Sequence, residues 1–240
     1  MDFNIGFISK LSGGVTIKFY FLYIILSMFF NNPILALVLI FIIYAVIDRR
    51  FIGSLPDFSG SFQRWRKTAA LKKQLGCTPS PGRIYYELGA LQVERGKMEE
   101  GRSNLEKAHE LIIDHPDIEY YLGVARIKTN ALDEGKVALE HAIQLNPKVK
   151  YGFPYVYLIE YTLKKHELQE KIDEYMDQIY QYSNPQILYE LGTIFQKEGF
   201  TEKAREMFQE VRLSLKQCPS FMKKQYRYFA IMAAIRNVFI

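Results

Sequence analysis

The sequence of 240 residues lacks the patterns on which most catalytic and metal sites depend. It holds only two cysteines, Cys77 and Cys218, which lie far apart and form no C-x-x-C pair. Neither a disulfide framework nor a structural zinc site is therefore expected. The metalloprotease motif H-E-x-x-H and the hydrolase motif G-x-S-x-G are both absent. We expect a protein that is not an enzyme, with no catalytic residue, no metal and no cofactor.

Acidic residues are scarce in one part of the chain. Residues 49–73 contain seven Lys and Arg side chains against a single acidic residue, Asp57, whereas the whole chain has a net charge of +5. The remainder of the chain is therefore close to neutral. A short basic strip next to an apolar segment indicates contact with a membrane surface, and the near-neutral remainder disfavours nucleic acid as a partner.

Charge is absent from the segment 19–47, and most of its residues are apolar. Its second half, ILALVLIFIIYAVI over residues 34–47, shows no polar stripe at helical spacing. A soluble core helix of this length would carry a polar face, and a cleaved signal peptide would be shorter and would end in a small-residue site. The segment therefore predicts a membrane anchor.

A polar interruption, Asn31-Asn32-Pro33, divides this segment. The proline suits the first position of a helix, the second asparagine suits its N-cap, and the first asparagine suits the left-handed residue that ends a helix. Helices over 12–30 and 33–52 would then form a transmembrane hairpin. The alternative is one kinked span, because a single helix over 19–47 would be about 43 Å long against about 30 Å of hydrocarbon.

Both arrangements place the rest of the chain on the same side of the membrane. Lys and Arg residues crowd immediately after the apolar segment, beginning at residues 49–50. Such residues are enriched on the cytoplasmic flanks of membrane segments. We therefore expect the protein in the cell membrane, with the remainder of the chain in the cytoplasm.

Residues 53–82 are predicted to form a basic connector with a short helix over about 61–75. The aromatic and basic side chains of this helix suit an interface with anionic lipid. The residues singled out for this contact are Arg64, Trp65 and Lys67. The alternative is that Trp65, Ala69 and Leu71 pack on the first helix of the following domain.

A pattern of about 34 residues recurs from residue 83 onward. Three copies carry Leu-Gly, followed by a turn residue seven positions beyond the glycine. The Leu-Gly pairs are Leu88-Gly89, Leu122-Gly123 and Leu191-Gly192, and the turn residues are Gly96, Asn130 and Gly199. A weaker copy over residues 155–185 keeps the period but has Leu158-Ile159 in place of Leu-Gly, with His166 as its turn residue. We expect a wider helix separation in this copy, since the small residue is lost.

This combination resembles the tetratricopeptide repeat (TPR), a family of helix–turn–helix units that stack into a superhelix. The resemblance covers residues 83–218. It implies an all-α fold with about four helix pairs, in which the glycine lets the paired helices approach closely. Residues 219–240 are predicted to form a further apolar helix, which covers the last repeat, lies along the membrane or docks a partner.

The resemblance also implies a concave groove that binds a partner protein, lined by the first helix of each repeat. The expected groove residues are Arg83, Tyr86, Glu94, Tyr120, Ile127, Lys128, Tyr189 and Lys197. Tyrosine recurs at the fifth repeat position, which suits a peptide or helix as the occupant. The alternative is that these tyrosines only fill the inner wall of a narrow solenoid. The clamp that binds chaperone tails in this family needs Lys and Asn where this chain has Tyr86 and Ala90, so that activity is not expected.

Taken together, these features predict a membrane-anchored scaffold that holds an unidentified protein partner at the cytoplasmic face of the membrane. An alternative of another class is a regulatory or assembly subunit of an integral membrane enzyme. In that case the apolar segment would pack against the spans of the enzyme itself.

Overall fold

The computed structural model describes residues 21–48, 58–166, 168–182 and 184–240. The chain divides into two compact units, residues 1–56 and 57–240, which are described separately. The described residues contain helices and connecting segments but no strand, in agreement with the all-α fold expected from the sequence.

In its described residues, the first unit is helical on both sides of a sharp break. Residues 21–30 are helical, and α2 comprises Pro33–Ile47. Between them, Asn31 adopts a left-handed conformation with a φ angle of 49°. The side-chain oxygen of Asn32 accepts hydrogen bonds of 3.0 and 3.2 Å from the backbone N–H groups two and three residues later, which caps α2. The predicted helix end and restart are confirmed, so one continuous helix over the whole apolar segment is ruled out.

The transmembrane character expected of this segment is not supported by its helices. In the part of the chain that the structure describes, no helix combines the length and the hydrophobicity that a membrane span requires. With 15 residues, α2 is about 22 Å long, whereas the hydrocarbon layer is about 30 Å thick. The outer parts of the expected hairpin arms, residues 12–20 and 49–52, lie outside the described residues.

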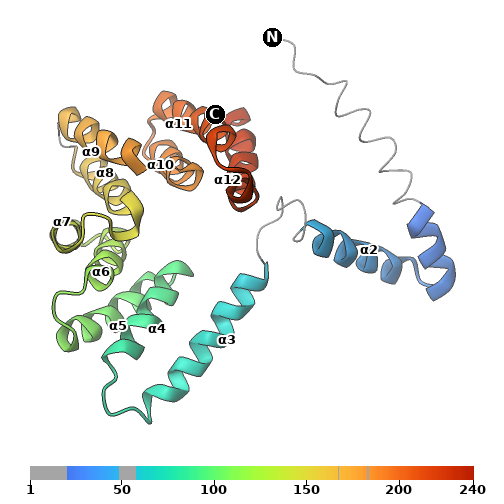
Figure 1. The fold of residues 1–240 in the computed structure, drawn as a ribbon, viewed down its shortest axis with the longest axis horizontal. Helices are drawn as coiled ribbons and strands as arrows, with labels where there is room; N and C mark the ends of the chain where they lie inside the picture. Colours follow the sequence, from blue (N-terminus) through green and yellow to red (C-terminus); the bar gives the residue numbers. More distant parts are fainter. Residues whose placement is uncertain (1–20, 49–57, 167, 183) are drawn as a thin grey trace. The chain divides into compact units, whose positions relative to one another are not determined.

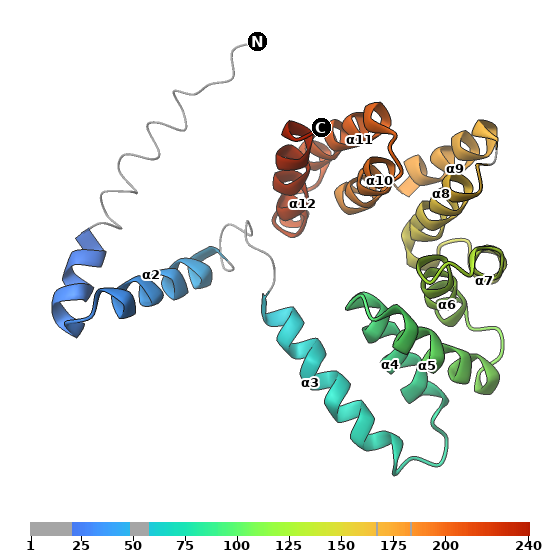
Figure 2. The ribbon, with the colours of Figure 1, turned by 180° about the vertical axis from the view of Figure 1, so that it is seen from behind.

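In its described residues the second unit consists of α3 (Phe58–Leu75), four helix pairs and a final helix (Figures 1 and 2). The pairs are α4 (Gly82–Glu94) with α5 (Met98–Leu111), α6 (Pro116–Lys128) with α7 (Leu132–Leu145), α8 (Phe153–Lys165) with α9 (Gln169–Tyr182), and α10 (Pro185–Lys197) with α11 (Thr201–Gln217). A short 3₁₀ segment, η2 (Val149–Gly152), precedes α8, and α12 (Ser220–Val238) follows the last pair. Both views show the pairs following one another along a curve, with the first helix of each pair on the inner side.

Each pair turns at the residue predicted from the repeat pattern. The four turn residues all adopt left-handed conformations: φ is 77° at Gly96, 67° at Asn130, 52° at His166 and 86° at Gly199. Glycine and asparagine accept this conformation more readily than other residues, and the chain reverses direction there. The helix–turn–helix period inferred from the sequence is thus confirmed.

Small residues let the two helices of a pair approach closely. A Cβ atom added at Gly123 in α6 would lie 2.7 Å from Cγ of Leu139 and 3.0 Å from the carbonyl oxygen of Gly135, both in α7. Gly89 and Gly192 are enclosed as tightly. A Cβ atom added at either position would lie 2.5 or 2.7 Å, respectively, from the nearest side-chain atom. These positions have no room for a larger residue unless the helices separate.

The third pair departs from this arrangement. Ile159 occupies the place of the glycine and is fully buried. The contact between α8 and α9 is less extensive than the contact within each of the other three pairs. The wider separation expected for this copy is therefore found, because the isoleucine side chain fills the space across which the backbones of the other pairs meet.

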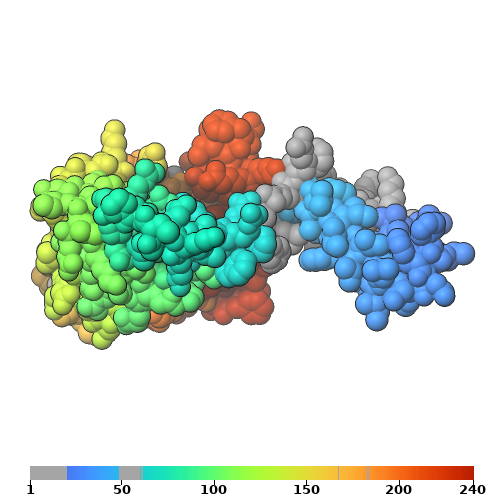
Figure 3. Space-filling view, turned by 90° about the horizontal axis from the view of Figure 1, so that it is seen from below, coloured from blue at the N-terminus to red at the C-terminus, as the bar shows by residue number. Residues whose placement is uncertain are grey.

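One side of α3 packs on α4. Thr68 and Leu71 are buried, and Nζ of Lys67 lies 2.9 Å from Oε2 of Glu87 in α4. Figure 3 shows the side chains of α3 and of the first repeat helices as one continuous teal surface. The helix of the basic connector therefore belongs to the same compact unit as the repeats.

The last helix, α12, covers the end of the repeat array. Tyr226, Ala230 and Ala233 are buried on the side that contacts α10 and α11. The two alanines belong to the apolar core that the last two helix pairs share. The sequence left three roles open for this helix: covering the last repeat, lying along the membrane or docking a partner. Its inner side covers the last repeat.

We predict that Gly123→Ala destabilises the protein. The added methyl group would collide with Leu139 and with the carbonyl oxygen of Gly135, so α6 and α7 would have to separate. Overpacking of this kind lowers the free energy of unfolding by about 1–3 kcal/mol. The matched control is Gly76→Ala, where the nearest atom is 4.0 Å from the added carbon. Denaturant titration followed by circular dichroism measures both variants, and equal midpoints would contradict the close approach.

Candidate functional site

The inner side of the array is formed by α4, α6, α8, α10 and α12, each of which contacts the next one along the row. We call the surface that these five helices present the inner wall. Tyrosines, carboxylates and cationic side chains meet on it, and most of them bind one another across neighbouring helices.

At the first two helices of the inner wall, tyrosines bind carboxylates. Oη of Tyr86 donates a hydrogen bond of 3.0 Å to Oδ2 of Asp117, and Oη of Tyr121 donates one of 2.8 Å to Oε1 of Glu94. Burial, reinforced by the neighbouring carboxylates, raises the pKa of both tyrosines above its ordinary value. The hydroxyl groups therefore remain protonated donors at physiological pH, and the two bonds join α4 to α6.

A strained segment brings a cation to this cluster. Lys150, Tyr151 and Gly152 adopt consecutive left-handed conformations with φ angles of 47°, 50° and 93°. Nζ of Lys150 lies 3.1 Å from Oδ2 of Asp117 and 4.8 Å from the ring centre of Tyr121. Such a backbone costs about 1–3 kcal/mol for each residue other than glycine, and strain of this kind is concentrated at functional sites. The segment therefore marks this end of the inner wall as a candidate binding surface.

A buried carboxylate joins α6 to α8 in the middle of the inner wall. Glu160 is only 1% exposed; its Oε2 lies 2.6 Å from Nζ of Lys128, and its Oε1 lies 3.1 Å from Nζ of Lys164. Nζ of Lys128 also lies 5.4 Å from the ring centre of Tyr157, which is 6.2 Å from the ring centre of Tyr120. The charge of Glu160 is thus balanced by two lysines within the protein.

Glu190 of α10 differs from the other carboxylates of the inner wall. Among the described residues it forms no hydrogen bond or ion pair, although it is half-buried. Burial raises the pKa of Glu190, and the charge of Glu160 adds to the effect, whereas Lys128 and Arg236 oppose it. Ionisation of this side chain therefore costs free energy in the folded protein.

The last helix supplies an arginine to the inner wall. Arg236 donates a hydrogen bond of 2.8 Å to Oε1 of Gln196, and its guanidinium lies 5.6 Å from the ring centre of Tyr189. The ring of Tyr189 also lies 5.7 Å, between centres, from that of Phe229 in α12. The inner wall therefore extends beyond the four pairs onto α12.

The expected groove residues fall into two groups. Six are accessible on or beside the inner wall: Arg83, Glu94 and Lys197 are exposed, and Tyr86, Lys128 and Tyr189 are half-buried. The other two need correction. Ile127 is fully buried because it points at α7, where a Cβ on Gly135 would meet it at 2.9 Å. Tyr120 is only 7% exposed because the rings of Tyr121 and Tyr157 flank it, at 5.0 and 6.2 Å between centres.

Several residues of the inner wall were missed by the sequence analysis. Tyr121, Tyr157 and Glu190 all occupy the sixth repeat position, immediately before the leucine of the Leu-Gly pair or its counterpart. Their shared register is a signal that could have found them. Arg236 lies beyond the repeats, and Lys150 reaches the inner wall from the segment between two pairs, so the repeat pattern contains no position for either.

The residues expected to contact lipid lie on α3 but differ in their surroundings. Trp65 is more than half exposed and stacks on Phe62, with ring centres 5.9 Å apart. Leu71 of the same helix is buried, with 7% of its surface exposed. Lys67 is bound to Glu87, and Arg64 is half-buried. The exposed aromatic pair thus remains available for an external contact.

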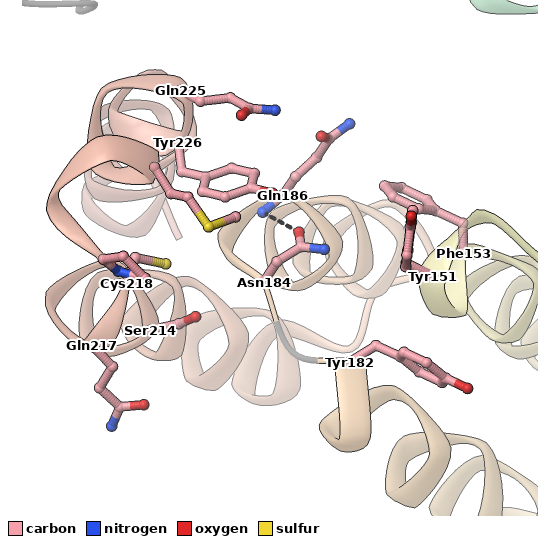
Figure 4. A pocket seen from close by; sticks show the side chains of 12 residues that line it. Tyr151, Phe153, Tyr182, Asn184, Gln186, Ser214, Gln217, Cys218, Gln225 and Tyr226 are labelled. Atoms are coloured by element: carbon pink, nitrogen blue, oxygen red, sulfur yellow. Dashed lines mark hydrogen bonds between the residues drawn. The ribbon is translucent and has the colours of Figure 1, made fainter. Parts of the chain in front are cut away.

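A pocket of about 640 Å³ lies where the starts of α8, α10 and α12 converge (Figure 4). Its lining contains no charged side chain: Tyr151, Phe153, Tyr182, Asn184, Gln186, Ser214, Gln217, Cys218, Pro219, Met222, Gln225 and Tyr226. The side chain of Asn184 caps α10 by accepting a hydrogen bond of 3.0 Å from the backbone N–H of Gln186. The pocket therefore offers amides, hydroxyl groups and aromatic rings, but no side chain that would bind an ion by charge.

The described residues contain no group of His, Cys, Asp or Glu side chains that is arranged to hold a metal ion. Nδ1 of His109 lies 2.7 Å from Oε1 of the buried Glu119. This contact joins α5 to α6 on the side away from the inner wall. That the chain has no metal, no cofactor and no catalytic residue stays a prediction.

Comparison with known proteins agrees with this architecture. No family model matches the sequence, and no curated protein does. Among solved structures, a thermophilic TPR protein of Thermus thermophilus, TTC0263, aligns with a TM-score of 0.51 and 16% identity, over 70% of this chain and 89% of that one. MamA aligns with a TM-score of 0.48 and 20% identity, over 62% of this chain and 87% of its own.

We predict that Glu160→Gln lowers the stability of the fold markedly. The substitution keeps the shape of the side chain but leaves Lys128 and Lys164 without their carboxylate, and losing one partner of a buried ion pair costs about 3 kcal/mol. The control is Glu202→Gln, which removes an exposed ion pair with Arg205 and should cost less than about 1 kcal/mol. If thermal unfolding shifts equally in both variants, the bridge between α6 and α8 is not the stabilising contact that its burial indicates.

Glu190→Gln should have the opposite effect at neutral pH. The folded-state pKa of Glu190 is raised, so the cost of its ionisation is absent below the ordinary carboxyl pKa and appears as the pH rises through the folded-state pKa. We therefore expect a higher melting temperature for the variant than for the parent at pH 7.5, and a difference that vanishes near pH 4. A variant that melts earlier at pH 7.5 would show that the carboxylate has a stabilising partner in the free protein.

Proposed function

The chain has the fold of a tetratricopeptide-repeat protein, and we propose that it acts as a scaffold that binds a segment of a partner protein along its inner wall. Binding rather than catalysis is the activity that this fold and the groups on the wall support. The partner segment runs along the row of first helices, either as a helix or as an extended peptide.

The unpaired carboxylate of Glu190 is the observation that carries this proposal. The other carboxylates described above on the inner wall are bound by tyrosines or lysines of the protein itself. Glu190 is half-buried without such a partner, and this costs the free protein stability. A hydrogen-bond donor of a partner segment would supply the missing bond, and the rings of Tyr157 and Tyr189 would flank the segment.

We further propose that the scaffold works at the cytoplasmic face of the cell membrane. The helical residues described in the first unit, 21–30 and 33–47, are mostly apolar, and their large side chains are mostly exposed, which is favourable only where an apolar environment covers them. The exposed pair of Phe62 and Trp65 on α3, next to several basic residues, adds a contact that suits anionic lipid. Nucleic acid is not proposed as a partner.

Site-specific photo-crosslinking in cells tests the use of the inner wall. A photoreactive residue at Lys197, exposed on the inner-wall helix α10, should give one dominant adduct. The same residue at Glu202, exposed on the second helix of that pair, should not. Adding Glu190→Lys to the first protein should lower the adduct yield, because a cation replaces the acceptor.

The identity and yield of the adduct decide between outcomes. Equal yields from the two positions, or an adduct insensitive to Glu190→Lys, would contradict binding at the inner wall. A soluble protein in the adduct supports the scaffold. An integral membrane enzyme that also co-purifies in a fixed ratio would instead favour a regulatory or assembly subunit.

A further inference from the structure

The side of α12 that faces away from the repeats carries a row of exposed apolar side chains. Phe221, Ile231, Ile235, Val238 and Phe239 are 80%, 37%, 46%, 79% and 81% exposed. Their spacing of ten, four, three and one residues places all five on one stripe of the helix. The buried residues of α12 lie on the opposite side, so the stripe is left uncovered by the protein.

This helix lies in a part of the chain that has no acidic residue. Residues 211–240 contain six Lys and Arg side chains and neither Asp nor Glu. Three of the cations, Lys223, Lys224 and Arg227, fall in the first half of α12. The helix that carries the exposed apolar stripe therefore contributes positive charge and no negative charge of its own.

The ends of a repeat array are normally covered by a polar face, which keeps the protein soluble. An apolar end face is stable only if something covers it, and the positive charge of α12 limits what that can be. A second copy docked through the same face would bring the cations of two helices together with no acidic group on either helix to balance them. A lipid bilayer with anionic headgroups meets both requirements, since it offers an apolar layer beneath a layer of negative charge.

We propose that the outer face of α12 lies in the interface of an anionic membrane. Phe221, Ile235 and Val238 enter the boundary of the acyl chains, and the lysines at the start of the helix contact the lipid phosphates. The proposal rests on the membrane location given under the proposed function and adds to it a contact at the opposite end of the repeats. Attachment at both ends would fix which side of the solenoid faces the cytoplasm.

A fluorescent probe in the full-length protein tests this contact directly. Both natural cysteines are replaced by serine, and an environment-sensitive fluorophore is attached at Ile235→Cys or, as the control, at Glu202→Cys. Each protein is reconstituted with vesicles of phosphatidylcholine alone or with added phosphatidylglycerol. We expect a blue-shifted emission, quenched by spin-labelled lipid, only for the probe at position 235 and only with the anionic vesicles.

Charge-matched variants show whether the lysines of α12 are responsible. Lys223→Gln with Lys224→Gln should reduce the quenching at position 235 on anionic vesicles. Lys148→Gln with Lys197→Gln removes the same charge from exposed positions elsewhere and should leave the quenching unchanged. If both double variants lose the same amount of quenching at position 235, a specific role of the α12 lysines in binding anionic lipid is overturned.

Flotation of the same samples separates this proposal from the general membrane location. If the protein does not float with the vesicles, the proposed membrane attachment itself fails. If it floats but the probe at position 235 reports water, the contact of α12 with the membrane is overturned. An emission shift that appears without vesicles and grows with protein concentration would identify a second copy as the occupant instead.

Discussion

Close contact between the backbones of paired helices determines the rest of this structure. In three of the four described pairs a glycine faces its partner helix at a distance that excludes any side chain. Because the two helices of such a pair cannot rotate or slide without a collision, each of these three pairs behaves as one rigid block. The blocks then stack with their first helices in a row, and this row defines which side chains form the inner wall.

Charged groups connect the blocks to one another in a different way from the apolar contacts within them. Asp117 accepts hydrogen bonds from Tyr86 and Lys150, so it links elements from different repeats. Glu160 accepts a hydrogen bond from Lys128 of the preceding repeat and forms an ion pair with Lys164 of its own helix. These groups are bound before any partner arrives, which holds the inner wall in a defined arrangement. Preorganisation of this kind reduces the ordering that a partner must impose on binding.

The repeat period, the helix pairs and the turns could be predicted from the sequence because each depends on a local signal. A left-handed turn residue, a small residue beside a leucine, and a proline at a helix start act within a few residues of the chain. The break at Asn31 and Asn32 belongs to the same class, since an N-cap and a left-handed residue are both local features. The transmembrane character of the segments around it depends on helix length, which these local signals do not define.

Contacts between distant residues were less accessible to sequence analysis. Tyr120 and Ile127 have the repeat positions of groove residues, but neighbouring rings cover one and α7 covers the other. Lys150 reaches Asp117 only because three successive residues adopt left-handed conformations, and Arg236 reaches Gln196 from outside the repeats. Positions in a repeat define a direction from the helix axis, whereas exposure depends on what the neighbouring helices place in that direction.

The loose third pair has a mechanical consequence. With an isoleucine where the other pairs have glycine, and with less contact between α8 and α9, this block resists bending less than the blocks on either side of it. Bending of the solenoid would therefore be largest at this pair. The helix pairs before it and after it would move relative to one another about a hinge at α9. The curvature of the inner wall could then change without any rearrangement inside the stiffer pairs.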